Sequence, residues 1–143
     1  MSTSSILLVE DHAGFAKALL NMLAQNPNLQ IVSIADSAET ALEYLRQSSV
    51  DLVLIDYSLP DMSGISLVQE ILQEHPDLRC VMLSGHLSLQ YAQRALEAGA
   101  RGYIIKDNPL GILAGLPRIL KGEIYLSEEL RNLGSTDLLT DFT

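Results

Sequence analysis

The sequence has little cysteine, few aromatic residues and few positive charges, and each shortage excludes a class of protein. Its one cysteine, Cys80, cannot form an internal disulfide and lacks a second cysteine or a histidine at zinc-site spacing. Tryptophan is absent, and 9 Lys and Arg stand against 18 Asp and Glu, for a net charge of −9. Nucleic-acid-binding domains usually carry a basic stripe, so no direct nucleic-acid contact is expected, whereas a cationic ligand or a basic partner surface stays open.

Two further absences concern targeting. No apolar run approaches the roughly 20 residues that a membrane-spanning helix needs, so no membrane contact is expected. The first residues, MSTSSILLVE, have neither a basic start nor a long apolar stretch, and they therefore do not look like a signal peptide. With 143 residues, 48% of them hydrophobic, the chain is long enough for one globular domain. A cytoplasmic protein is the default expectation.

What the sequence does contain is a regular alternation of short apolar runs and longer amphipathic segments. Each of five predicted strands is followed by a predicted helix, the last helix weakened by Gly111, Gly115 and a Pro117 that should kink or shorten it. This alternation predicts an α/β fold with a parallel, doubly wound sheet. After Glu123 the sequence allows a short strand and a last helical turn, and 135–143 is typical of a linker or a frayed end. The predicted strands are 5–10, 30–35, 51–56, 79–84 and 102–105, and the predicted helices are 14–25, 37–47, 64–75, 88–98 and 109–121.

Polar side chains stand where four of these strands end. Because ligands of open parallel sheets sit outside the carboxyl ends of the strands, these groups are expected to meet at one edge. Clustered carboxylates repel each other unless they take up protons or hold a cation, and hard oxygen ligands suit Mg²⁺. An Asp beside Mg²⁺ can attack a phosphoryl group, with a Lys and a Ser hydroxyl stabilising the phosphoryl oxygens. The groups are Glu10, Asp11, Asp56, Ser84 and Lys106, and together they predict an acyl-phosphate site with Asp56 as nucleophile.

The chain resembles the receiver domain of two-component response regulators, most closely the NarL/FixJ subfamily, over roughly residues 5 to 126. The resemblance implies a flavodoxin-like (β/α)5 domain at 1–126 with a five-stranded parallel sheet in the order 2-1-3-4-5, and an extension at 127–143. No helix-turn-helix domain follows in this sequence, so it is either a stand-alone receiver or part of a longer regulator. The motifs that carry the resemblance are LLVEDH (7–12), DLVLIDYSLPDMSG (51–64), VMLSG (81–85) and GYIIKD (102–107), together with KGEIYLS.

The resemblance implies that Asp56 accepts a phosphoryl group from a sensor histidine kinase in a Mg²⁺-dependent reaction. Asp11 would be the direct metal ligand beside Asp56 and the Ser58 backbone carbonyl, and Glu10 would act partly through water. Glu10 departs from the Asp that is commoner in the family. Lys106 would pair with the phosphoryl group.

The same resemblance implies a switch and an output. Ser84 would move to hydrogen-bond the phosphoryl group, and Tyr103 would swing into the space that Ser84 leaves. The protein would be a signalling module and not a metabolic enzyme, catalysing only its own phosphorylation and dephosphorylation. In a full-length regulator it would control transcription through a helix-turn-helix domain, and a homodimer formed on phosphorylation is left open.

Simpler interpretations stand beside these. Asp56 alone would be a turn cap, Ser84 a strand-end serine, Lys106 a surface lysine and Tyr103 a packed core aromatic. Three other functions compete: a phosphatase with an Asp nucleophile, a flavin- or nucleotide-binding module, and a pseudo-receiver that only binds partners. Ser58 stands where a phosphatase wants a second Asp, and the acids of VEDHAGF would repel a nucleotide phosphate.

Overall fold

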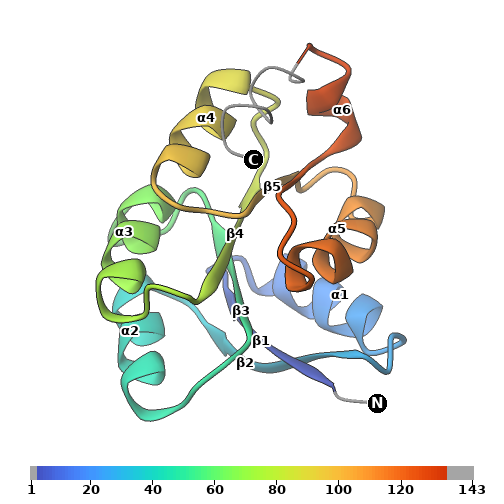
Figure 1. Cartoon of the computed structure of the whole chain (residues 1–143). Coiled ribbons are helices and arrows are strands. Elements are labelled where there is room, and N and C mark those ends of the chain that lie inside the picture. Colours follow the sequence, from blue (N-terminus) through green and yellow to red (C-terminus); the bar gives the residue numbers. More distant parts are fainter. Residues whose placement is uncertain (1–2, 135–143) are drawn as a thin grey trace.

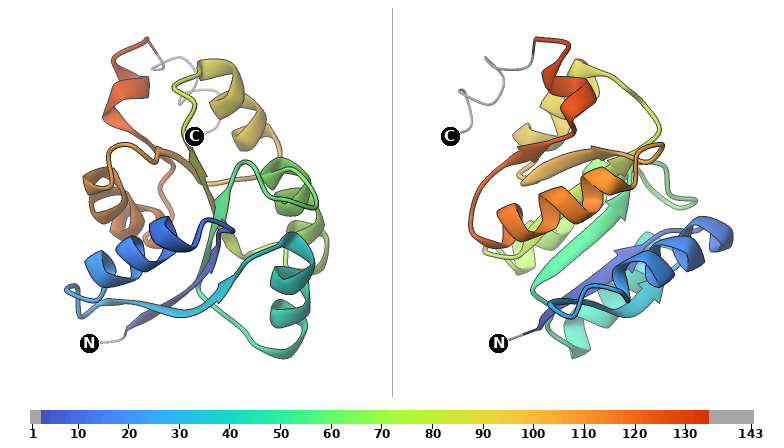
Figure 2. Two further views of the ribbon diagram at one scale, coloured as in Figure 1. Left: turned by 180° about the vertical axis from the view of Figure 1, so that it is seen from behind. Right: turned by 90° about the vertical axis from the view of Figure 1, so that its right-hand side faces the viewer.

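Residues 3–134, which the computed structural model describes, form a parallel sheet with helices on both faces (Figures 1 and 2). The strand order is β2-β1-β3-β4-β5-β6. The strands are β1 (Ser4–Val9), β2 (Leu29–Ala35), β3 (Leu52–Asp56), β4 (Arg79–Ser84), β5 (Gly102–Ile105) and β6 (Tyr125–Leu126). The helices are α1 (Ala13–Leu23), α2 (Ala38–Gln47), α3 (Gly64–Glu74), α4 (Leu89–Glu97), α5 (Leu110–Leu120) and α6 (Glu128–Arg131).

The predicted doubly wound parallel sheet and the order of its first five strands are confirmed. The structure adds a sixth strand, β6, which pairs in parallel with β5 at the edge of the sheet. This strand and the single turn of α6 lie where the sequence after Glu123 allowed them. The predicted linker at 135–143 lies outside the described residues.

The sheet separates two apolar clusters, and successive strand residues alternate between them. In β1, Leu7 and Val9 face the cluster under α2, α3 and α4, whereas Ile6 and Leu8 face the cluster under α1 and α5. Figure 1 shows these two groups of helices on opposite sides of the sheet. Burial on both faces explains why the last four residues of β1 and the first four of β3 are all apolar instead of alternating apolar with polar.

Helix α5 differs from its expectation. It continues past Pro117 to Leu120, so the expected shortening does not occur. Leu116 and Ile119, both fully buried against the sheet, hold the turn around the proline in place. A Cβ on Gly115 would lie 2.5 Å from the Tyr125 ring, so β6 packs where the helix has no side chain. Among the helices described, none is long and apolar enough to cross a membrane.

Candidate functional site

The predicted site residues meet at the edge formed by the carboxyl ends of the strands. Asp56 and Ser84 are the last residues of β3 and β4, and Lys106 directly follows β5. Glu10 and Asp11 directly follow β1, whose register with β3 pairs Val9 with Ile55. Parallel register therefore brings the ends of β1 and β3 to the same level, which is why residues 45 positions apart share one site.

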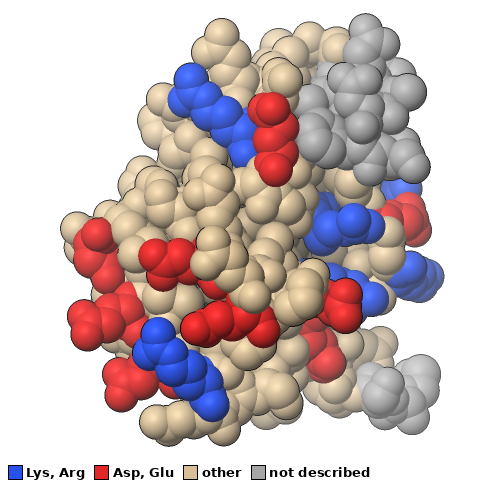
Figure 3. Space-filling model, turned by 60° about the vertical axis from the view of Figure 1, so that its left-hand side comes forward, with Lys and Arg blue, Asp and Glu red and all other residues tan. Residues whose placement is uncertain are grey.

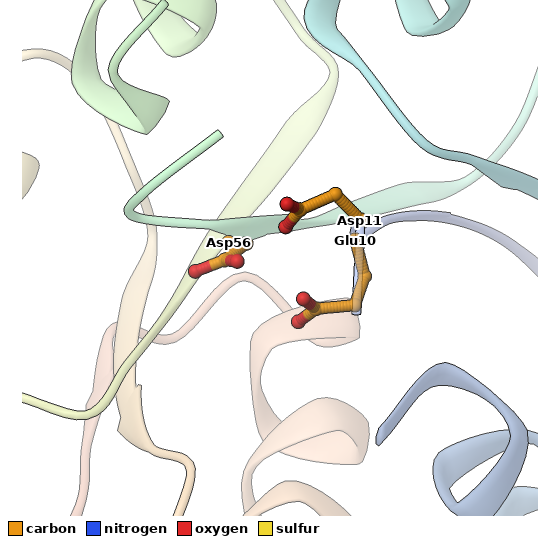
Figure 4. A group of neighbouring side chains, drawn as sticks. All are labelled: Glu10, Asp11 and Asp56. Atoms are coloured by element: carbon orange, nitrogen blue, oxygen red, sulfur yellow. The ribbon is translucent and has the colours of Figure 1, made fainter. Parts of the chain in front are cut away.

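The three carboxylates point into one space (Figure 4). One oxygen from each of Glu10, Asp11 and Asp56 lies within 4.8 Å of the others. Asp11 is exposed, whereas Glu10 and Asp56 are 1% and 7% exposed. Two buried acids and one accessible acid, all hard oxygen donors, fit a cation that keeps part of its water shell, and Mg²⁺ is such a cation.

Lys106 is the positive charge of the cluster. Its Nζ donates to Glu10 Oε1 at 2.7 Å and lies 3.5 Å from Asp56 Oδ2. Burial raises the pKa of Glu10, and the hydrogen bonds from Lys106 and from the His12 backbone N–H oppose that rise. One ammonium is thus shared between two carboxylates, with the shorter contact to Glu10.

The loop after Asp56 is held close to the strand end. The Ser58 backbone N–H donates to Asp56 Oδ1 at 3.1 Å, which fixes the carboxylate relative to its own loop. A Cβ on Gly64 would lie 2.5 Å from the Asp56 carbonyl oxygen, so only glycine lets α3 begin this close to the site. Asp61 in the same loop accepts from the backbone N–H groups of Ala38 and Glu39, which lowers the pKa of its carboxyl group and ties the loop to α2.

Ser84 and Tyr103 belong to β4 and β5, which lie on the side of β3 opposite β1. Ser84 is 1% exposed, and its Oγ accepts from the His86 backbone N–H at 3.0 Å. Tyr103 is fully buried, and its hydroxyl donates to the His86 carbonyl oxygen at 2.7 Å. Both side chains therefore bind the loop after β4 at the same residue, His86. Tyr103 occupies an inward position here, and its movement stays a prediction.

Sequence reasoning missed two neighbours of the site. The Phe15 ring, in the first turn of α1, lies 4.4 Å from Lys106 Nζ. The Tyr57 ring stacks on the Tyr91 ring of α4, with centroids 4.9 Å apart. No spacing along the sequence signals either contact, because each joins elements that only the fold brings together.

Comparison with known proteins gives one consistent family. The model of the response regulator receiver domain matches residues 6–114. The chain is 35% identical over 135 residues to the Fimbriae Z protein of Salmonella typhimurium (strain LT2), covering 92% of this chain and 63% of that protein. It is also 35% identical over 102 residues to the DNA-binding transcriptional activator DevR/DosR of Mycobacterium tuberculosis, covering 71% and 47%. The chain thus spans about half to two thirds of these relatives.

The fold has solved counterparts. The crystal structure of a two-component response regulator of the LuxR family from Aurantimonas sp. SI85-9A1 superposes with a TM-score of 0.88. It is 29% identical, and the match covers 92% of this chain and 94% of that one. The agreement extends across nearly the whole chain and is therefore not limited to the strand-end motifs.

Proposed function

The chain belongs to the receiver domain family of response regulators, the phosphorylation switches of two-component systems, and we propose that Asp56 is its phosphoacceptor. The observation that carries this proposal is that the Asp56 carboxylate lies beside two other carboxylates and 3.5 Å from the Lys106 ammonium at one edge of the sheet. In the space beside Asp56, the Asp11 and Glu10 carboxylates lie at opposite ends (Figure 4). Lys106, which is bound to Glu10, and a cation bound by Asp11 can therefore approach Asp56 from two directions.

In the proposed reaction an Asp56 carboxylate oxygen attacks the phosphorus of a phosphohistidine on a sensor histidine kinase. The new P–O bond forms as the P–N bond breaks, and the imidazole nitrogen leaves with the electron pair and takes a proton from solvent water. Lys106 offers its ammonium to the transferred oxygens. Bound Mg²⁺, held by Asp11, Asp56 and the Ser58 carbonyl with Glu10 acting through water, would neutralise charge on the phosphoryl group.

Output is part of the same proposal. Ser84 turns toward the phosphoryl group and gives up its bond from the His86 N–H, and the loop that Tyr103 also holds moves with it. The proposal places the chain in the cytoplasm with the kinase, and it leaves a phosphorylation-dependent homodimer as a further step. Self-catalysed phosphorylation and hydrolysis are the only chemistry proposed, because Ser58 offers no carboxylate for faster turnover.

The domain boundaries are part of the same proposal. We propose residues 1–126 as the receiver and 127–143 as the extension toward a DNA-binding output domain, because a longer relative is named a DNA-binding transcriptional activator. Figure 3 shows acidic side chains spread across the middle and lower left of one face, with one basic side chain among them and the other basic ones toward the top and right. That face does not suit a DNA backbone, so DNA binding is assigned to the output domain.

The test is the intact mass of the purified chain after incubation with acetyl phosphate, with and without Mg²⁺. A single phosphoryl adduct is expected that requires Mg²⁺ and is absent from Asp56→Asn. The matched control is Asp77→Asn, an exposed aspartate in the loop between α3 and β4, which should be phosphorylated like the wild type. An adduct that persists in Asp56→Asn would assign the reaction to another residue. No adduct on the wild type would favour the pseudo-receiver.

A further inference from the structure

Lys106 is held by an aromatic ring as well as by carboxylates. Its Nζ lies 4.4 Å from the centroid of the Phe15 ring, while Glu10 accepts from it at 2.7 Å. The Lys106 side chain keeps 20% of its surface exposed, so the ammonium is neither fully buried nor free in solvent. A cation over an aromatic face is attracted by the ring quadrupole, and the attraction grows as water is excluded.

The position of Phe15 follows from the start of α1. His12 is the N-cap residue, and its Nδ1 accepts from the Phe15 backbone N–H at 3.0 Å. This first turn directly follows Glu10 and Asp11, so the segment that supplies two of the acids also presents the ring. Phe15 is half-buried and packs against the apolar cluster under α1 and α5, which restricts where the ring can lie.

We propose that Phe15 is a positioning residue for phosphoryl transfer: its ring holds the Lys106 ammonium over the acid cluster. The inference rests on the proposed function, because it concerns the same lysine. Lys carries a point charge on a flexible stem of four carbons, so orienting it costs conformational entropy. A ring restrains the ammonium without accepting a conventional hydrogen bond. A carboxylate at that position would instead compete with the phosphoryl oxygens for Lys106.

The alternative is that Phe15 only fills space beside the apolar cluster. Substituting pentafluorophenylalanine at position 15 separates the two roles, because the fluorinated ring keeps a similar shape but its face is no longer electron-rich. Phosphorylation by acetyl phosphate with Mg²⁺ should slow by about three- to tenfold, the range expected for a partly exposed cation–π contact. Phe15→Leu should slow it similarly, and Phe15→Tyr should keep the rate within about twofold, because Tyr retains the electron-rich face.

A double-mutant cycle with Lys106→Met makes the test specific to the ammonium. In the Lys106→Met background, whose reaction is followed over longer times, fluorination should no longer change the rate. The inference would be overturned if fluorination of residue 15 left the phosphorylation rate unchanged in the protein that keeps Lys106. An equal loss of rate with Lys106 and with Met at that position would overturn it too. Thermal unfolding of each variant identifies any loss caused by destabilisation. If the unsubstituted protein took up no phosphoryl group at all, the proposed function and not the role of Phe15 would be refuted.

Discussion

Lys106 is the residue whose partners must change if Asp56 is phosphorylated. Its Nζ donates to Glu10 at 2.7 Å and lies 3.5 Å from Asp56, so Glu10 is its closer ion-pair partner in this structure. Burial makes the Glu10 carboxylate costly, and the lysine offsets part of that cost. Moving the ammonium toward a phosphoryl group would leave Glu10 less well paired unless a cation takes over. Metal binding and phosphorylation are therefore expected to support each other.

Tyr103 gives a prediction at high pH. Burial raises the pKa of its hydroxyl to about 12, above the value of about 10 for a free tyrosine. The contribution of the protonated Tyr103 hydroxyl to stability is therefore fully present below pH ~10 and is lost as the pH rises toward ~12. The reason is that Tyr103 loses its hydroxyl proton at a lower pH in the unfolded chain than in the folded one. We expect absorbance titration of the phenolates to contain a late component that Tyr103→Phe removes, and stability to fall less steeply above pH 10 in that variant.

Tyr44→Phe is the matched control for this titration, because Tyr44 on α2 is partly exposed. Its removal should leave the late component in place. The same late component in Tyr103→Phe would contradict the assignment, and so would a wild-type protein whose five tyrosines all titrate together.

The sequence predicts site residues well where the backbone alone determines their place. Asp56, Ser84 and Lys106 were predicted to meet because they stand at the carboxyl ends of strands that pair in parallel. Phe15 was missed because its contact with Lys106 depends on how α1 packs against the sheet. The inward position of Tyr103 likewise depends on the path of the loop that carries His86.

At the scale of elements, the segment of β6 and α6 is bound to β5. The Ser127 Oγ accepts from the Ile105 backbone N–H at 2.9 Å, one residue before Lys106, and the Ser127 N–H donates to the Tyr103 carbonyl oxygen. Leu130 of α6 is fully buried in the cluster under α2, α3 and α4. The segment that leads out of the domain thus contacts the same strand that supplies Tyr103 and precedes Lys106.

Ser127→Ala tests this attachment. Ser127 is 1% exposed, so its removal leaves the Ile105 N–H without a buried partner, and we expect the free energy of unfolding to fall by about 1–3 kcal/mol. Chemical denaturation measures the loss. Ser49→Ala, at an exposed loop serine, should change stability by less than about 0.5 kcal/mol. Equal stabilities for the two variants would mean that water or another group replaces the hydroxyl.

Helix α5 marks the limit of element prediction from local propensity. Gly115 was interpreted as a weakness of the helix, but the Tyr125 ring occupies the space that a Cβ would need. The sequence contains both residues without any signal that they touch. Helix propensity includes the cost of a glycine inside a helix. It cannot include the space that this glycine leaves for Tyr125, because Tyr125 belongs to a strand later in the chain.

At the scale of the whole molecule, the two apolar clusters lie on opposite faces of the sheet and share its strands, because each strand contributes side chains to both clusters. Leu52 and Leu54 of β3 face one cluster, and Val53 and Ile55 face the other. Neither cluster can open without exposing the strand that ends in Asp56. Unfolding is therefore expected to be cooperative across the sheet, as is usual for single domains of this size.

Cys80 can report that cooperativity. It lies on β4 in the central part of the sheet, is fully buried, and burial raises the pKa of its thiol to about 12. Because the thiolate is the reactive form, the native protein should not react with a disulfide reagent such as dithionitrobenzoate, and labelling should follow unfolding by denaturant. The labelling curve should coincide with loss of far-ultraviolet circular dichroism. Labelling well before that loss would mean that the β4 region opens locally, and the sheet would then not unfold as one unit.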